Sequence, residues 1–174
     1  MNVTKPRLVI LLLLTVLHVG VSAECMSTRR FSEESSPVFC PNSFAVKSIA
    51  CYGSFCDDKQ LTCCRYAPGY DRSATNGWSS WFSDEGREDG TNQQYTQSGF
   101  VSGMACSGKY CDNLRLNYLR SANFSNTGAC EWTSSFSEEQ RSMSCPGDAF
   151  VSGLRCQGRY CDNLQLYCCQ LRAR

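Results

Sequence analysis

Apolar and polar residues alternate in several short windows of this chain. Windows 114–118 and 164–168 place an apolar side chain at every second position, as one face of an extended strand requires. Residues 132–136 and 150–154 have the composition of further strands, and Gly, Asn, Asp and Ser separate these windows. No window after residue 24 has a convincing helical period. The pattern therefore predicts an all-β fold of short strands.

One stretch differs from all others because it is apolar almost throughout. Residues 8–19 follow the basic residues Lys5 and Arg7, and small residues then lead up to Ala23. This order is typical of a secretory signal peptide, and we expect residues 1–23 to be removed. The apolar stretch is shorter than the roughly 20 residues that span a bilayer. The sequence therefore predicts a secreted, extracellular protein with no membrane span.

Charge and histidine content narrow the function classes. Without Lys5 and Arg7, 15 basic side chains face 16 acidic ones, which gives a net charge of −1. This balance argues against nucleic acid as a partner. The only histidine, His18, lies in the signal peptide, so residues 24–174 lack the usual general base and imidazole metal ligand. We expect no cofactor, no metal site and no enzymatic activity.

Three stretches of the secreted region align with one another, at residues 24–66, 76–120 and 130–172. Adding 105 to each cysteine number of the first stretch gives the number of a cysteine in the third. The middle stretch keeps a Cys-x-Gly-x-x-Cys segment but has only the two cysteines of that segment, Cys106 and Cys111. We therefore expect residues 24–174 to form a single domain of three tandem repeats.

All 14 cysteines lie in the secreted region, where an oxidising compartment favours disulfide bonds. Because the middle repeat has only the third and fourth cysteines of the pattern, we expect these two to bond to each other in every repeat. Adjacent cysteines cannot bond to one another without strain. The order of the remaining pairs stays open, as does a bridge between repeats or between chains. The expected bonds are Cys51–Cys56, Cys106–Cys111 and Cys156–Cys161, with Cys25 and Cys40 joined to Cys63 and Cys64, and Cys130 and Cys145 joined to Cys168 and Cys169.

A repeat of three or four short strands is too small to bury an apolar face by itself, but three repeats around an axis can do so. The expected fold is a disulfide-rich, pseudo-three-fold, β-prism-like arrangement of the three repeats. A β-trefoil-like arrangement is the alternative. We expect large aromatic residues at repeated positions to fill the shared core, namely Trp78, Trp81, Trp132, Phe82 and Phe136.

Short motifs of the repeats resemble a known family. They are Trp78-x-x-Trp81, Cys145-Pro146, Phe-Val-Ser-Gly followed by an apolar residue at 150–154, and Asp-Asn-x-x-Leu-x-Cys-Cys at 162–169. This pattern is similar to the repeat of the vitelline membrane outer layer proteins. The resemblance implies a β-prism of three Greek-key sheets, a place in an extracellular coat, and carbohydrate binding. Where the family has a longer acidic, threonine-containing segment, this chain has the short disulfide loop, so a ligand site on that segment is not expected to carry over.

The Cys-x-Gly-x-x-Cys turns contain the candidate ligand-binding residues, which are Tyr110, Asp112, Asn113, Tyr160, Asp162 and Asn163. Amide and carboxylate groups beside an aromatic ring can engage the hydroxyls and CH faces of a sugar. Repeated weak sites would gain avidity on a repeated glycan. In the alternative interpretation, the Asp-Asn pair only begins the last strand of the repeat, and the Asp accepts a turn hydrogen bond. Each repeat offers too few oxygen ligands for a calcium site.

Two further motifs bear on function. Paired carboxylates recur as Glu33-Glu34, Asp84-Glu85 and Glu138-Glu139 and offer the one enzymatic route, because a glycosidase uses two carboxylates. Their recurrence argues against this route, since an active site is normally a single asymmetric arrangement.

The sequon Asn123-Phe124-Ser125 marks Asn123 as an N-glycosylation site on an expected loop between repeats.

Together these features predict a secreted structural or glycan-binding component of an extracellular coat or matrix. Its expected partners are extracellular glycans or matrix components. A secreted defence lectin or recognition module is one alternative, and a carbohydrate-active hydrolase is another. The sequence does not predict an oligomeric state.

Overall fold

The computed structural model describes residues 24–83, 91–95, 98–126 and 128–174. The predicted signal peptide, residues 1–23, and the acidic pair Asp84-Glu85 lie outside the described residues. Fourteen β-strands and three short 3₁₀ turns make up the regular structure of the described residues, which contain no α-helix. The predicted all-β fold is therefore confirmed.

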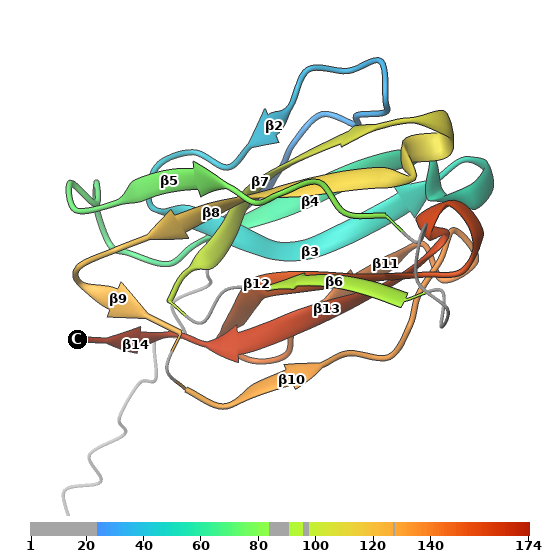
Figure 1. Cartoon of the computed structure of the whole chain (residues 1–174). Helices are drawn as coiled ribbons and strands as arrows, with labels where there is room; N and C mark the ends of the chain where they lie inside the picture. Colours follow the sequence, from blue (N-terminus) through green and yellow to red (C-terminus); the bar gives the residue numbers. More distant parts are fainter. Residues whose placement is uncertain (1–23, 84–90, 96–97, 127) are drawn as a thin grey trace, which may run out of the picture.

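Three long antiparallel hairpins form the framework of the molecule (Figure 1). Their strands are β3 (Phe44–Tyr52) with β4 (Asp58–Arg65), β7 (Phe100–Ser107) with β8 (Asn113–Arg120), and β12 (Ala149–Gln157) with β13 (Asn163–Gln170). A 3₁₀ turn joins the two strands of each hairpin, and these turns are η1 (Ser54–Cys56), η2 (Lys109–Cys111) and η3 (Arg159–Cys161). The pairing register shifts once in each hairpin, just after Val46, Val101 and Val151, which lie at equivalent repeat positions. A shift at the same place gives the three hairpins the same local bend.

Each hairpin is the centre of a four-stranded sheet that takes one outer strand from its own repeat and one from another repeat. The first repeat gives a strand to the second, the second gives one to the third, and the third gives one to the first. A separate two-stranded sheet pairs β9 (Phe124–Ser125) with β14 (Arg172–Ala173). The outer strands are β1 (Cys25–Ser27) and β11 (Ser142–Ser144) on the first hairpin, β5 (Thr75–Trp78) and β2 (Val38–Phe39) on the second, and β10 (Cys130–Trp132) and β6 (Thr91–Tyr95) on the third.

Apolar side chains from all three hairpins form a common core. Leu114 and Leu116 of β8 and Leu164 and Leu166 of β13 are fully buried, as their alternation predicts. Complete burial of one such side chain contributes about 1.5–3 kcal/mol. A second, smaller cluster lies beside β9 and includes Phe100 and Phe150, whose rings pack edge to face.

All 14 cysteines form disulfide bonds, and every bond lies within one repeat. The three short-loop bonds, Cys51–Cys56, Cys106–Cys111 and Cys156–Cys161, are present as predicted. The order that the sequence left open is the same in the two outer repeats. Its bonds are Cys25–Cys64 and Cys40–Cys63 in the first repeat, and Cys130–Cys169 and Cys145–Cys168 in the third.

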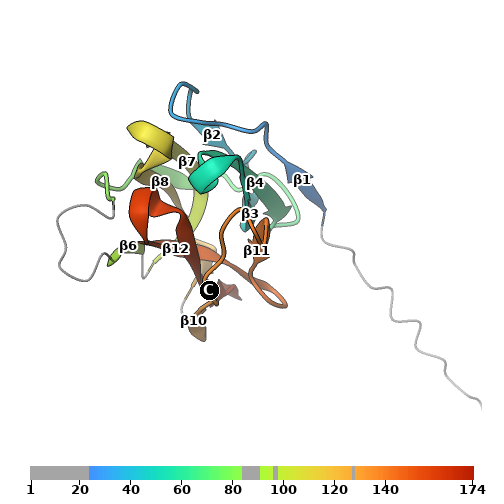
Figure 2. The ribbon, with the colours of Figure 1, turned by 90° about the vertical axis from the view of Figure 1, so that its right-hand side faces the viewer.

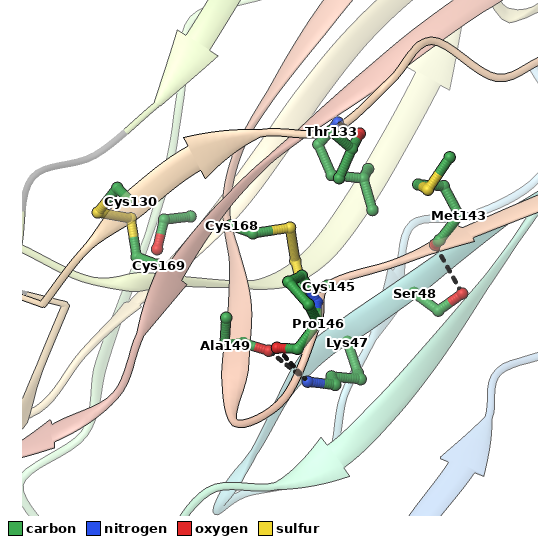
Figure 3. The surroundings of a disulfide bond; sticks show 12 residues. Lys47, Ser48, Cys130, Thr133, Met143, Cys145, Pro146, Ala149, Cys168 and Cys169 are labelled. Atoms are coloured by element: carbon green, nitrogen blue, oxygen red, sulfur yellow. Dashed lines mark hydrogen bonds between the residues drawn. A yellow bond between two sulfur atoms is a disulfide. The ribbon is translucent and has the colours of Figure 1, made fainter.

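One disulfide in each outer repeat follows directly on the strand that this repeat gives away. Cys145 comes just after β11, and its bond to Cys168 ties the donated strand back to its own hairpin (Figure 3). On the receiving hairpin, Ser48 donates a hydrogen bond to the Met143 carbonyl at 2.8 Å. The Lys47 ammonium donates to the Ala149 carbonyl at 2.6 Å, so the first repeat holds the third on both sides of Cys145.

The middle repeat secures its donated strand differently. It has no cysteine at the position equivalent to Cys145. Its strand β6 instead pairs with β12 over five positions, compared with three positions for β11 and two for β2. The longer ladder supplies additional backbone hydrogen bonds where the covalent tether is missing.

The prediction that the tryptophans fill the core is wrong. Trp78 is 36% exposed and Trp81 is 45% exposed. Trp132 is half-buried. Trp78 belongs to β5, an edge strand of its sheet, and its ring contacts Arg115 and Phe39 instead of joining the core clusters. Phe82 and Phe136 are buried, as expected.

Candidate functional site: two aromatic surfaces

The three hairpin turns meet at one end of the molecule, which faces the viewer in Figure 2. Phe55, Tyr110 and Tyr160 are the central residues of the turns, and their rings pack against one another. The ring centroids are 5.1 to 5.5 Å apart, within the usual range for aromatic pairs. We call these three residues the turn-end cluster. The predicted residues Tyr110 and Tyr160 are thus brought together.

A glycine begins each of these turns because no other residue fits there. Gly53, Gly108 and Gly158 have φ angles of 71° to 77°, in the left-handed region. A Cβ atom at Gly108 would collide with the carboxylate of Asp112, which folds back under the turn. The same geometry recurs between Gly158 and Asp162.

The predicted Asp-Asn pairs are engaged within their own turns. The Asn113 side-chain amide donates to Asp112 Oδ1 at 3.1 Å, and Asn163 donates to Asp162 Oδ1 at 2.8 Å. Asp112 is buried. Burial raises the pKa of Asp162, although the hydrogen bonds from Asn163 partly oppose this effect. These contacts agree with the alternative interpretation of the pair, in which the Asp accepts hydrogen bonds that hold the turn.

Phe55 was missed among the candidates, although the repeat alignment offers a signal for it. It occupies the position of Tyr110 and Tyr160, but the first repeat follows it with Asp57-Asp58 rather than Asp-Asn. Phe55 is 37% exposed, so the turn-end cluster presents an apolar ring to solvent. This surface can pack against the CH face of a ligand, while the adjacent Asp-Asn groups are used internally.

A buried lysine is the second residue that the sequence did not indicate. Lys59 is fully buried and donates to the Cys56 carbonyl at 2.5 Å. Burial lowers the pKa of Lys59 from 10.5 to about 8, even though the carboxylates of Asp57, Glu33, Asp58 and Asp112 favour the charged form. The equivalent positions of the other repeats hold leucines that pair in the same way with buried phenylalanines.

The second aromatic surface lies on the outer face of the middle sheet. The Arg115 guanidinium lies 4.4 Å from the centroid of the Trp78 ring system and 4.6 Å from that of Trp81. Phe39, which is 52% exposed, packs edge to face on Trp78 with a centroid distance of 5.5 Å. Phe39 belongs to the strand donated by the first repeat, so strand exchange completes this surface. We call these four residues the tryptophan–arginine surface.

Cation–aromatic contacts recur on the other two sheets, but their aromatic rings are less exposed than those of the tryptophan–arginine surface. Arg155 lies 4.4 Å from the Trp132 ring centroid, and Arg30 lies 3.6 Å from the Tyr52 ring centroid. Such contacts contribute about 0.5–1 kcal/mol at exposed sites and fix the orientation of the ring. The tryptophan–arginine surface combines two well-exposed indoles that are held in place in this way.

The remaining candidate chemistry is limited. Glu138, from one of the repeated acidic pairs, accepts a hydrogen bond from the Phe55 backbone N–H at 3.3 Å and so contacts the turn-end cluster. Within the part of the chain that the structure describes, no three His, Cys, Asp or Glu side chains are grouped so that they could hold a metal ion. The same part of the chain contains no helix of the length and hydrophobicity needed to cross a membrane.

Comparison with protein-family models, curated proteins and solved structures finds no match for this chain.

Proposed function

We propose that this protein is a secreted, disulfide-rich component of an extracellular coat or matrix, that it binds glycans, and that it is not an enzyme. Seven disulfide bonds in a chain of this size support an oxidising destination. The residues after position 23 contain no histidine, which removes the most common catalytic base.

The proposed architecture is a pseudo-three-fold β-prism of three repeats, as the resemblance to the vitelline membrane outer layer proteins implies. Three equivalent hairpins and a cyclic exchange of outer strands support it. The packing of Phe55, Tyr110 and Tyr160 on one another at one end of the molecule supports an axis through that end. A β-trefoil-like arrangement is less favoured, because each hairpin here is the centre of a separate four-stranded sheet.

Glycan binding is proposed on one observation, the exposure of Trp78 and Trp81, whose rings both contact the Arg115 guanidinium. The electron-rich face of an indole attracts the polarised CH groups on one face of a pyranose ring. Indoles already ordered by Arg115 lose little conformational entropy when a sugar packs on them. This assignment replaces the Asp-Asn turns as the proposed ligand site.

Replacing Trp81 with alanine is expected to weaken glycan binding by tenfold or more, about 1.4 kcal/mol, because an exposed tryptophan platform dominates such a contact. The measurement is a glycan-array screen of the oxidised, secreted protein, followed by titration of the best ligand. Tyr110→Ala is the matched control, since it removes an aromatic ring from the turn-end cluster and leaves the tryptophan–arginine surface intact.

The outcomes separate the candidate functions. Loss of binding in Tyr110→Ala but not in Trp81→Ala would move the site to the turn-end cluster. A well-folded wild-type protein that binds no glycan would contradict glycan binding and leave a structural role in the coat. Cleavage of a bound glycan would contradict the non-enzymatic proposal and indicate a hydrolase.

A further inference from the structure

The sequon borders a surface hollow at the end of the molecule that contains the smaller apolar cluster. This hollow has a volume of about 280 Å³ and is lined in part by Pro68, Tyr70, Asn123 and Phe124. Tyr70 is 76% exposed, the largest exposed fraction among the large apolar side chains of the described residues. An aromatic ring so exposed beside a hollow leaves apolar area for an occupant.

The Asn123 side chain is held at the rim of this hollow. Its amide nitrogen lies 3.3 Å from Ser73 Oγ and 3.5 Å from Asp71 Oδ1 and donates to both. The backbone N–H of Asn123 donates to Ser121 Oγ at 3.0 Å. A glycosylated amide keeps one N–H group, which is enough to retain one of the two side-chain bonds. The direction in which a sugar leaves Asn123 is therefore restricted.

The partners of Asn123 are themselves fixed. Asp71 is buried and accepts hydrogen bonds from the Tyr66 hydroxyl at 3.0 Å and from Ser73 Oγ at 2.6 Å. Burial alone would raise the pKa of Asp71, but these hydrogen bonds outweigh burial and lower it, so the carboxylate stays charged. The Tyr66 ring packs edge to face on Phe124, with centroids 5.5 Å apart. Asp71 and Phe124, which both line the hollow, are thus held in place before any sugar is attached.

We propose that Asn123 carries an N-linked glycan whose first N-acetylhexosamine occupies this hollow and packs on Tyr70. The inference rests on the proposed secretion of the chain. In the attachment step, a bond forms between Asn123 Nδ2 and the sugar C1 of a lipid diphosphate-linked oligosaccharide. The bond between C1 and the diphosphate oxygen breaks, the diphosphate leaves with the electron pair, and the amide loses one proton.

The covalent link is the reason to favour this occupant over a free ligand. A sugar tethered at the rim is present at a high effective concentration near Tyr70. Even a weak contact between the sugar and the Tyr70 ring is therefore formed most of the time. The apolar face of the sugar would cover the Tyr70 ring, and its hydroxyls would remain in water at the open side of the hollow. The glycan would then contribute to the stability of the fold through its contact with Tyr70.

The test is a double-mutant cycle on protein secreted from a glycosylating host. Asn123→Gln removes the acceptor and keeps an amide, and Tyr70→Ala removes the ring. The glycosylated protein, trimmed enzymatically to a single sugar, is expected to have a Tm about 2–4 °C above that of Asn123→Gln. Tyr70→Ala is expected to lower the Tm by a similar amount in the glycosylated protein and to have little effect in the Asn123→Gln background.

A second measurement does not depend on stability. The N-acetyl methyl proton signal of the trimmed glycan is expected to show a ring-current shift that disappears in Tyr70→Ala. Equal effects of Tyr70→Ala in both backgrounds, together with an unshifted methyl signal, would overturn the proposal. An unmodified Asn123 in the intact mass of the secreted protein would also overturn it. Neither result affects the glycan binding assigned to Trp81, which is measured separately. Failure of the chain to enter the secretory pathway, by contrast, would contradict the proposed function itself.

Discussion

Replacing both Cys145 and Cys168 with alanine is expected to lower the free energy of unfolding by about 3 kcal/mol. The bond closes a loop between residues 23 positions apart, and the loss of this constraint increases the entropy of the unfolded chain by the corresponding amount. Removal of the bond also frees the donated strand β11 from its own hairpin. Chemical denaturation under oxidising conditions measures the change, and hydrogen exchange at Met143 reports on β11.

The Cys106→Ala, Cys111→Ala double variant is the matched control. Both of its cysteines are also buried, but its loop joins residues only five positions apart. The chain-entropy contribution is then about 2 kcal/mol, and no donated strand is tethered by this bond. Equal losses in the two double variants, with Met143 exchanging at the same rate in both, would show that the tether on β11 contributes nothing to stability.

Lys59→Leu is expected to stabilise the protein by about 1 kcal/mol at pH 7. The lowered pKa of Lys59 corresponds to a penalty of about 3 kcal/mol for holding the charged group in the fold. Loss of the charge-assisted hydrogen bond to the Cys56 carbonyl offsets about 2 kcal/mol of the gain. Leucine is the natural choice because Leu114 and Leu164 occupy the equivalent positions.

This stabilisation depends on pH in a defined direction. The folded protein releases the Lys59 proton at a pH of about 8, whereas the unfolded chain holds it up to 10.5. The penalty is therefore fully present below about pH 8 and decreases as the pH rises toward 10.5. The difference in unfolding free energy between Lys59→Leu and wild type should shrink across that window. Lys109→Leu, at an exposed position, is the control, and an unchanged difference from pH 7 to 10 would refute the buried-charge explanation.

The hairpins and the shared core could be predicted from sequence because they depend on local patterns. Alternation at 114–118 and 164–168 identified inward-facing leucines, and the partial cysteine set of the middle repeat identified the short-loop bonds. The order of the other bonds depends on which of two adjacent cysteines faces the core. Cys63 lies in the main core and bonds to Cys40, whereas Cys64 belongs to the smaller cluster and bonds to Cys25.

The exchange of strands gives almost no sequence signal. β2 contains only Val38 and Phe39, which is too short for any alternation to be recognised. Its partner β7 belongs to another repeat, and the similarity of the repeats suggests instead that each one closes on itself. Pairing between distant segments is decided by tertiary packing, which local propensity does not encode.

The tryptophan positions differ among the three repeats, and this difference agrees with the exposure of the indoles. Trp78 and Trp132 are equivalent to Ser27 in the first repeat, whereas the neighbouring phenylalanine position is conserved as Phe31, Phe82 and Phe136. A position that accepts serine in one copy does not need an apolar environment. Two of the three indoles are exposed on the surface, where a ligand can reach them.

Because the repeats exchange strands in a ring, proteolytic cleavage between the repeats is not expected to separate them. Cleavage in the two connections between repeats, at 67–75 and 121–129, would leave three pieces that no disulfide joins to one another. Each piece would still have a strand hydrogen-bonded into the next one around the ring, so the nicked molecule would stay assembled. It would separate in denaturant without any reducing agent. Durability in a protease-rich setting would then depend on the interlocking of the strands as well as on covalent bonds.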